Sequence, residues 1–136
     1  MKRHVLTDGR GVPLAAVLSA ANVHDKWSLA ATLDAVVLRA GPRPRRPAHV
    51  CLDKGYCFKD CEALVRARHI VPHIRRKGEP PLVGRVYGRP RRWVVERTNS
   101  WCNRFRALLV RWELKSQNYL ALVHLACALI ALQHSA

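Results

Sequence analysis

A β-hairpin is predicted at the start of the chain, and it constrains the fold more than any other feature. Two extended apolar runs, residues 2–7 and 12–20, flank the turn-forming sequence Asp8-Gly9-Arg10-Gly11. Glycine adopts the positive φ angles of tight hairpin turns at little cost, so this spacing predicts two antiparallel strands. The residues after Met1 offer no apolar core of the length that a signal peptide has, and we expect no export signal.

The rest of the chain alternates predicted helices and strands. Asp25 is placed to cap a helix that ends by Gly41-Pro42, and a strand over residues 48–52, a helix over 59–68 and a strand over 70–74 follow. Helical spacing then predicts one helix over residues 91–113 and a final apolar helix from Ser116 to about residue 133. The expected apolar stripes are Trp27, Leu29, Ala30, Leu33, Val36 and Val37 in the first helix, and Val94, Trp101, Phe105, Leu108 and Trp112 in the third. This order predicts an α/β or α+β fold.

The chain carries a large excess of positive charge. Lysine and arginine number 24 against 9 aspartate and glutamate residues, which gives a formal net charge of +15. Such a field attracts polyanions and makes nucleic acid the leading partner, with a role in solubility alone as the alternative. The residues expected to contact backbone phosphates are Arg43, Arg45, Arg46, Arg75, Arg76, Lys77, Arg89 and Arg91.

Neither a cysteine metal site nor a membrane span is expected. The five cysteines include no CxxC pair, and Cys57 and Cys61 lack a second ligand pair at zinc-finger spacing. Buried free thiols in a reducing cytoplasm are the prediction. The longest apolar stretch, residues 119–132, is shorter than a bilayer span of about 20 residues and indicates a buried helix.

Two of the nine acids are candidates for chemistry. Asp53 follows a predicted strand, where sheets present ligands and catalytic groups, although it could equally cap a turn. Glu96 lies one helical turn after Arg92, which could simply neutralise it in a structural ion pair. Two carboxylates from distant segments of a cationic chain nonetheless suggest a divalent-metal site that acts on phosphodiesters. The other acids have structural explanations as turn, cap, loop or helix-surface residues.

Four segments resemble bacterial insertion-sequence transposases of the DDE type. They read KRHVLTDGRGVPLAAVLSAANVHD, LDKGYCF, RRWVVERTNSWCNRFRALLVRWE and NYLALVHLACALIAL, and they cover nearly the whole chain. The resemblance implies a ribonuclease H-like mixed sheet with C-terminal helices, in which Asp53 is the second catalytic Asp and Glu96 the catalytic Glu. Tyr56 and Arg92 match flanking signature positions, and Asn103 stands where many relatives have a lysine. Two Mg²⁺ or Mn²⁺ ions, DNA ends and target DNA are the implied cofactors and partners.

The first catalytic Asp of the family lies on a strand upstream of the segment matched by Lys2-Arg3-His4. We therefore expect residues 1–136 to form a single partial domain, the C-terminal portion of the catalytic domain, whose sheet lacks its first and central strand and which is inactive alone. An upstream-encoded polypeptide or a second copy of the chain would then be a partner. Two alternatives stay open: a non-catalytic DNA-binding module, and a small nuclease that recruits Asp8 or Asp25 as its third ligand.

Overall fold

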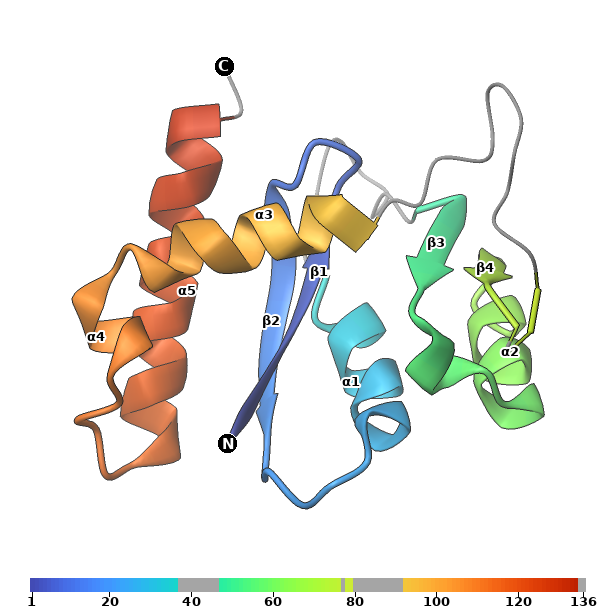
Figure 1. The fold of residues 1–136 in the computed structure, drawn as a ribbon, viewed down its shortest axis with the longest axis horizontal. Coiled ribbons are helices and arrows are strands. Elements are labelled where there is room, and N and C mark those ends of the chain that lie inside the picture. The colour runs from blue at the N-terminus through green and yellow to red at the C-terminus, as the bar shows by residue number, and fades with distance from the viewer. Residues whose placement is uncertain (37–46, 77, 80–91, 135–136) are drawn as a thin grey trace.

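The computed structural model describes residues 1–36, 47–76, 78–79 and 92–134, and within them the fold is mixed α/β (Figure 1). The described residues form two separate two-stranded sheets, with order β1-β2 and β3-β4, and helices pack against both. The elements are β1 Lys2–Thr7, β2 Pro13–Ser19, η1 Asp25–Ser28, α1 Leu29–Asp34, β3 His49–Leu52, η2 Lys54–Tyr56, α2 Lys59–Arg66, β4 Val71–Ile74, α3 Arg92–Asn103, α4 Arg106–Leu109 and α5 Ser116–His134. The prediction of an α/β or α+β fold class is confirmed.

The predicted N-terminal hairpin is confirmed. Strands β1 and β2 pair antiparallel, with Val5 opposite Ala16, and a register shift lies between Leu6 and Thr7. The Asp8 carboxylate closes the turn by accepting hydrogen bonds from the backbone amides of Arg10 (2.8 Å) and Val12 (2.9 Å). Asp8 is therefore a turn residue, as its position in the sequence indicated.

The second sheet follows the predicted strand, helix, strand order. Strands β3 and β4 are parallel, and α2 connects them and packs against β4. The two sheets share apolar contacts: Leu6 of β1 packs against a cluster that contains Leu29 and Leu33 of α1 and Val50 of β3. Val65 of α2 completes this cluster and is fully buried. Apolar burial therefore connects the hairpin to β3, which belongs to a different sheet.

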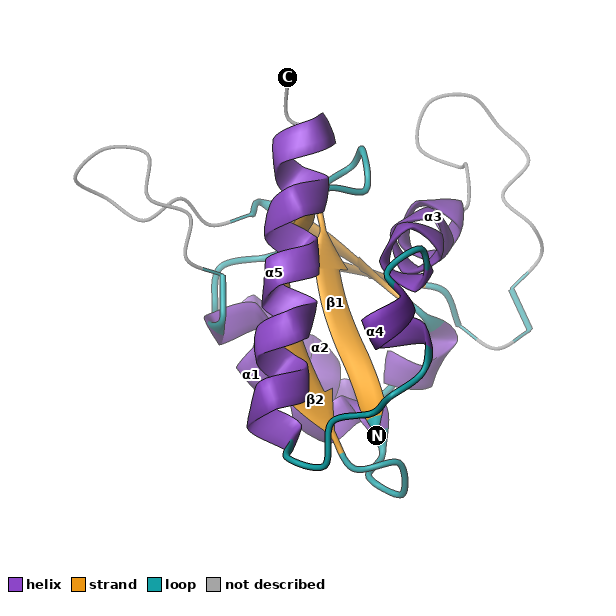
Figure 2. Ribbon diagram, turned by 90° about the vertical axis from the view of Figure 1, so that its left-hand side faces the viewer, coloured by secondary structure: helices purple, strands orange, loops and turns teal. Residues whose placement is uncertain are grey.

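The C-terminal helices cover the hairpin. Helix α5 lies along one face of β1 and β2 (Figure 2), and Val123 and Ile130 pack with Ala16 in a second cluster. His124 Nε2 lies 3.0 Å from the carbonyl oxygen of Ala16, which adds a polar contact between α5 and β2. Helix α3 crosses beside the same hairpin and contacts β1, α4 and α5.

The prediction of one helix over residues 91–113 was wrong. Helix α3 ends at Asn103, and a separate short helix, α4, spans Arg106–Leu109 after an extended Phe105 (φ −81°, ψ 108°). The break allows Leu108 to enter the second cluster, where its carbonyl accepts a hydrogen bond from the Tyr119 hydroxyl at 3.2 Å. Trp112, expected in the core, is 79% exposed. Tertiary packing overrides the helical spacing here.

Helix α5 is only partly the buried helix that the sequence predicted. Tyr119, Val123, Ala126 and Ile130 are buried, whereas Leu125, Leu129 and Leu132 are 40% to 75% exposed. By length and composition alone α5 could cross a membrane, a test that the core helices of other proteins also pass. Its buried stripe packs on the hairpin, so in this fold it acts as a covering helix.

Three other local predictions need correction. His24, rather than Asp25, is the N-cap of the first helical segment, and its side chain accepts from the amide of Lys26. Asp25 instead forms an ion pair with Lys2 of β1 at 2.9 Å. Trp27 is 70% exposed, and Val37 and the segment up to Gly41-Pro42 fall outside the described residues. The five cysteines are free thiols, but only Cys61 and Cys102 are buried as predicted, whereas Cys57 and Cys127 are half-buried and Cys51 is exposed.

Candidate functional site

Asp53 directly follows β3 and is the N-cap of η2. Its carboxylate accepts a hydrogen bond from the Lys54 backbone amide at 2.8 Å, and its carbonyl accepts from the Tyr56 amide at 2.9 Å. The residue is exposed. Both explanations that the sequence left open are therefore compatible, because Asp53 caps a turn and also stands at an exposed strand end.

Tyr56, which the sequence resemblance places at a signature position, packs against the cluster formed around Val65. Burial raises the pKa of its hydroxyl to about 12, and the nearby charges of Asp25, Cys61 and Asp53 act in the same direction. The phenol therefore stays protonated at neutral pH. Helical segment η1 contacts η2, which explains why Asp25 and Asp53 influence the same hydroxyl.

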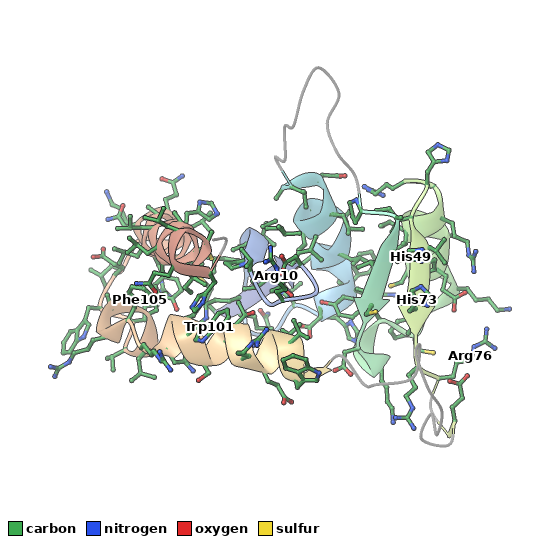
Figure 3. The ribbon with its side chains drawn as sticks, turned by 90° about the horizontal axis from the view of Figure 1, so that it is seen from above. Arg10, His49, His73, Arg76, Trp101 and Phe105 are labelled. Atoms are coloured by element: carbon green, nitrogen blue, oxygen red, sulfur yellow. The ribbon has the colours of Figure 1, made fainter. Side chains whose placement is uncertain are left out.

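Glu96 is exposed on α3, and the helix is anchored to the hairpin turn by its neighbours. Thr98 is fully buried and donates a hydrogen bond to the Gly11 carbonyl oxygen at 2.6 Å. The Arg97 guanidinium donates to the Arg10 carbonyl oxygen. Figure 3 shows α3 running beside the turn that carries Arg10. These contacts fix the helix that presents Glu96, and no local pattern in the sequence predicts them.

Gly11 makes this close approach possible. Its φ angle is +89°, and a Cβ atom at this position would lie 3.1 Å from the Thr98 hydroxyl oxygen and 3.4 Å from two nitrogens of Arg97. A side chain here would be strained by the backbone angle and crowded by α3. The glycine of the predicted turn is thus also a docking point for α3, a role for which the turn pattern alone gives no signal.

Arg97 is held between two aromatic rings on the same helix. Its guanidinium carbon lies 4.7 Å from the Trp93 ring centroid and 5.0 Å from that of Trp101. Trp101 in turn stacks on His134 of α5, with ring centroids 4.1 Å apart. This stack orients Arg97 toward the hairpin and connects the two C-terminal helices that cover it.

The other two positions that were predicted to match the family signature, Arg92 and Asn103, lie at the two ends of α3. Arg92 is its first residue, and its side chain is outside the described part of the structure. Asn103 is the last residue, and its Oδ1 accepts a hydrogen bond from Arg3 Nη2 of β1 at 2.9 Å. At the position where the resemblance predicts a lysine in many relatives, the chain therefore has a neutral side chain that binds an arginine.

Glu96 and Asp53 come from different parts of the fold. Helix α3 packs on the hairpin, and β3 pairs with β4, while the N-terminal end of α3 is directed toward β3 in Figures 1 and 3. Within the described ranges, no three or more His, Cys, Asp or Glu side chains are grouped so that they could hold a metal ion. Asp8 is bound in its turn and Asp25 to Lys2, so neither completes a three-acid set there.

A family model described as a transposase DDE domain matches residues 1–131. The chain belongs to the DDE transposase family. It is 38% identical over 135 residues to a Burkholderia cepacia protein described as "Putative transposase for insertion sequence element IS402". That match covers 95% of this chain and 61% of the relative, so the chain spans about three fifths of the relative's length. No solved structure matches it.

The resemblance to insertion-sequence DDE transposases is thereby confirmed, whereas the roles of single residues in this transposase domain stay predictions. Of the basic residues expected to contact DNA, two are described: Arg75 donates to the Glu79 carbonyl oxygen at 3.0 Å, and Arg76, whose amide donates to Glu79 Oε2, is exposed. The others, Arg43, Arg45, Arg46, Lys77, Arg89 and Arg91, lie outside the described residues.

Proposed function

We propose that this domain supplies two of the three metal-binding acids of a DDE transposase, Asp53 and Glu96, for DNA cleavage and strand transfer. The family match over residues 1–131 carries the proposal. Two structural facts support it: Asp53 is exposed at a strand end, and Glu96 is exposed on a helix that the hairpin anchors with its N-terminal end toward β3. The DNA partner, and with it a cytoplasmic, nucleoid-associated location, follows from the same family and from the net charge of +15.

The carboxylates of Asp53 and Glu96 are of the right chemical type to bind divalent metal ions, but they are one fewer than the three acids of the proposed site. Their oxygens are the hard ligands that Mg²⁺ and Mn²⁺ prefer. When bound, a pair of such ions would activate the attacking hydroxyl and stabilise the leaving oxygen of the phosphodiester. A third acid from outside residues 1–136 completes the set in this proposal, so the chain alone binds metal weakly and is inactive.

The two separate sheets support a ribonuclease H-like fold that needs a further strand. Strands β1 and β3 belong to different sheets yet share an apolar cluster through Leu6 and Val50. A strand that carries the first acid would lie between them and join the sheets into one. A preceding segment or an upstream-encoded polypeptide supplies it in this proposal.

The residues around the two acids have positioning roles. Segment η2 holds Asp53 through the Lys54 amide, and the protonated Tyr56 hydroxyl can donate a hydrogen bond at neutral pH. Thr98 and Gly11 fix the helix that carries Glu96. Arg75, Arg76 and the basic residues outside the described ranges would hold backbone phosphates.

Iron-mediated cleavage of the polypeptide tests the metal site without requiring activity. Fe²⁺ takes the place of Mg²⁺, and with ascorbate and peroxide it generates radicals that cut the backbone beside its ligands. We expect cuts near residues 53 and 96 that compete with Mg²⁺, and their loss in Asp53→Asn and Glu96→Gln. Glu62→Gln on α2 is the matched control and should leave the pattern unchanged. Equal cleavage of all three variants would contradict the proposal.

A non-catalytic DNA-binding module is the second candidate, favoured by the charge of +15 and by the absence of a three-acid group in the described residues. Titrating a DNA duplex at increasing salt separates the two. Mg²⁺ does not tighten the binding of a pure DNA binder, because the ion competes for the DNA phosphates, and Asp53→Ala and Glu96→Ala do not weaken that binding. The proposed transposase site predicts tighter binding with Mg²⁺ that both variants lose. Specific nicking of the element's ends by the chain alone would show that the third acid is not needed.

A further inference from the structure

Two histidines face each other on the exposed surface of the second sheet. His49 Nδ1 of β3 lies 3.0 Å from His73 Nε2 of β4, and the ring centroids are 5.1 Å apart (Figure 3). Both side chains are exposed. We propose that this pair binds a divalent transition-metal ion of the class that prefers imidazole, such as Zn²⁺ or Ni²⁺, and that the ion connects β3 to β4.

The parallel register of the strands creates the pair. His49 is opposite Val71, and Cys51 is opposite His73, so the two histidines are diagonal neighbours. Alternation along each strand puts both on the face opposite the buried Val50. The backbone ladder therefore holds the two rings over one spot of the surface, which lowers the conformational cost of binding an ion there.

The distance between the facing nitrogens suits a metal. Two imidazole nitrogens at about 2.0–2.1 Å from a tetrahedral ion lie about 3.3 Å apart. The observed 3.0 Å therefore needs to widen only slightly. In the metal-free pair one facing nitrogen carries the proton of the hydrogen bond, and binding requires that ring to carry its proton on the other nitrogen, so no proton has to leave the pair.

The chemistry of the donors separates this site from the proposed acid site. Nitrogen ligands favour Zn²⁺, Ni²⁺ and Cu²⁺, whereas Mg²⁺ takes oxygen ligands. With two protein ligands the remaining positions are open to water, in keeping with the finding that no larger ligand group is formed by the described residues. The exposed thiol of Cys51, opposite His73, lies on the same face.

Zinc titration of the complete chain tests the proposal by two measurements. Calorimetry should show binding in wild type that weakens at least about tenfold in His49→Gln and in His73→Gln. His69→Asn is the matched control, because His69 is exposed at φ 59°, an angle that asparagine tolerates, and it should bind zinc as wild type does. At about 100 times the wild-type dissociation constant, zinc should raise the wild-type Tm by about 10 °C and that of each Gln variant by at most about half as much.

Side-chain ¹H–¹⁵N spectra of the wild type locate the ion without any substitution. Zinc should shift His49 Nδ1 and His73 Nε2, while equal Mg²⁺ should shift neither. Zinc-induced shifts confined to other histidines, or unchanged affinity in both Gln variants, would overturn the proposal. Asp53→Asn should keep zinc binding intact, and His73→Gln should keep the iron-mediated cut near Glu96, so the two proposed sites can fail independently.

Discussion

Thr98 on α3 donates a hydrogen bond to the carbonyl oxygen of Gly11 in the hairpin turn, at 2.6 Å and across 87 residues of sequence. The hydroxyl is buried and also lies 3.1 Å from the Val94 carbonyl of its own helix. This contact joins the first and the third quarter of the chain, and it fixes the helix that carries Glu96 against the hairpin.

Replacing Thr98 with valine removes the hydroxyl and keeps the side-chain shape. The buried Gly11 carbonyl then loses its donor, and we expect the free energy of unfolding to fall by about 1–3 kcal/mol. Urea unfolding followed by tryptophan fluorescence measures the change. Ser100→Ala on the exposed side of the same helix is the control and should cost less than about 0.5 kcal/mol. Equal losses in the two variants would contradict the role of the bond.

Gly11→Ala should destabilise the fold through both the backbone and the packing. The φ angle of +89° disfavours a side chain, and the new Cβ would meet the Thr98 hydroxyl oxygen at 3.1 Å. We expect a loss of about 1–3 kcal/mol in the free energy of unfolding. Gly9→Ala, in the same turn, has nothing within 4 Å of the added atom and no positive φ, so its effect on urea unfolding should be small.

His4 should make stability depend on pH. The side chain is 8% exposed with Nε2 2.7 Å from Ser19 Oγ, and burial lowers its pKa from 6.5, a shift that Asp25 opposes and Lys2 assists. As the pH falls, His4 is therefore protonated at a higher pH in the unfolded chain than in the folded one. The contribution of neutral His4 to the free energy of unfolding is fully present above pH 6.5 and is lost as the pH falls below that value. The stability difference between wild type and His4→Asn should shrink between pH 7.5 and 5.5, and a constant difference would refute the assignment.

Val65→Ala should weaken the half of the molecule that carries Asp53. Val65 is fully buried in the cluster that contains Val50 and Leu29, and the lost methyl groups and the resulting cavity should cost about 2 kcal/mol of unfolding free energy. Val71→Ala on β4 is a matched change at a 44% exposed position and should cost clearly less in the same urea titration. A similar cost at both positions would show that burial does not decide the effect.

The sequence predicted those elements whose signals are local. The hairpin, the β3, α2, β4 order and α5 could be read from turn residues and apolar periodicity, because each is decided by a short stretch. The break between α3 and α4 could not, since Leu108 leaves the helical path to pack beneath Tyr119, which lies 11 residues further on. Asp25 likewise occupies a position in the sequence that predicts a helix cap, but its carboxylate forms an ion pair with Lys2 of β1 instead.

The candidate site shows the same division. Asp53 and Glu96 could be proposed as candidates because acids are rare in this cationic chain and most of the others had structural explanations. The docking of Thr98 on Gly11 and the pairing of His49 with His73 depend on how distant elements meet. The register that sets His73 opposite Cys51 is a property of the folded sheet.

Backbone hydrogen bonds between neighbouring strands fix their relative position in steps of one residue. Apolar contacts between packed layers allow shifts of fractions of an ångström. The hairpin and β3 meet through Leu6 and its apolar neighbours and sit in different sheets of the described structure. The β3-β4 sheet, which leads to Asp53, and the hairpin, which anchors the helix of Glu96, are therefore held together by apolar packing and can shift slightly relative to each other. A strand inserted between the two sheets, or DNA bound across them, would therefore also set the distance between Asp53 and Glu96.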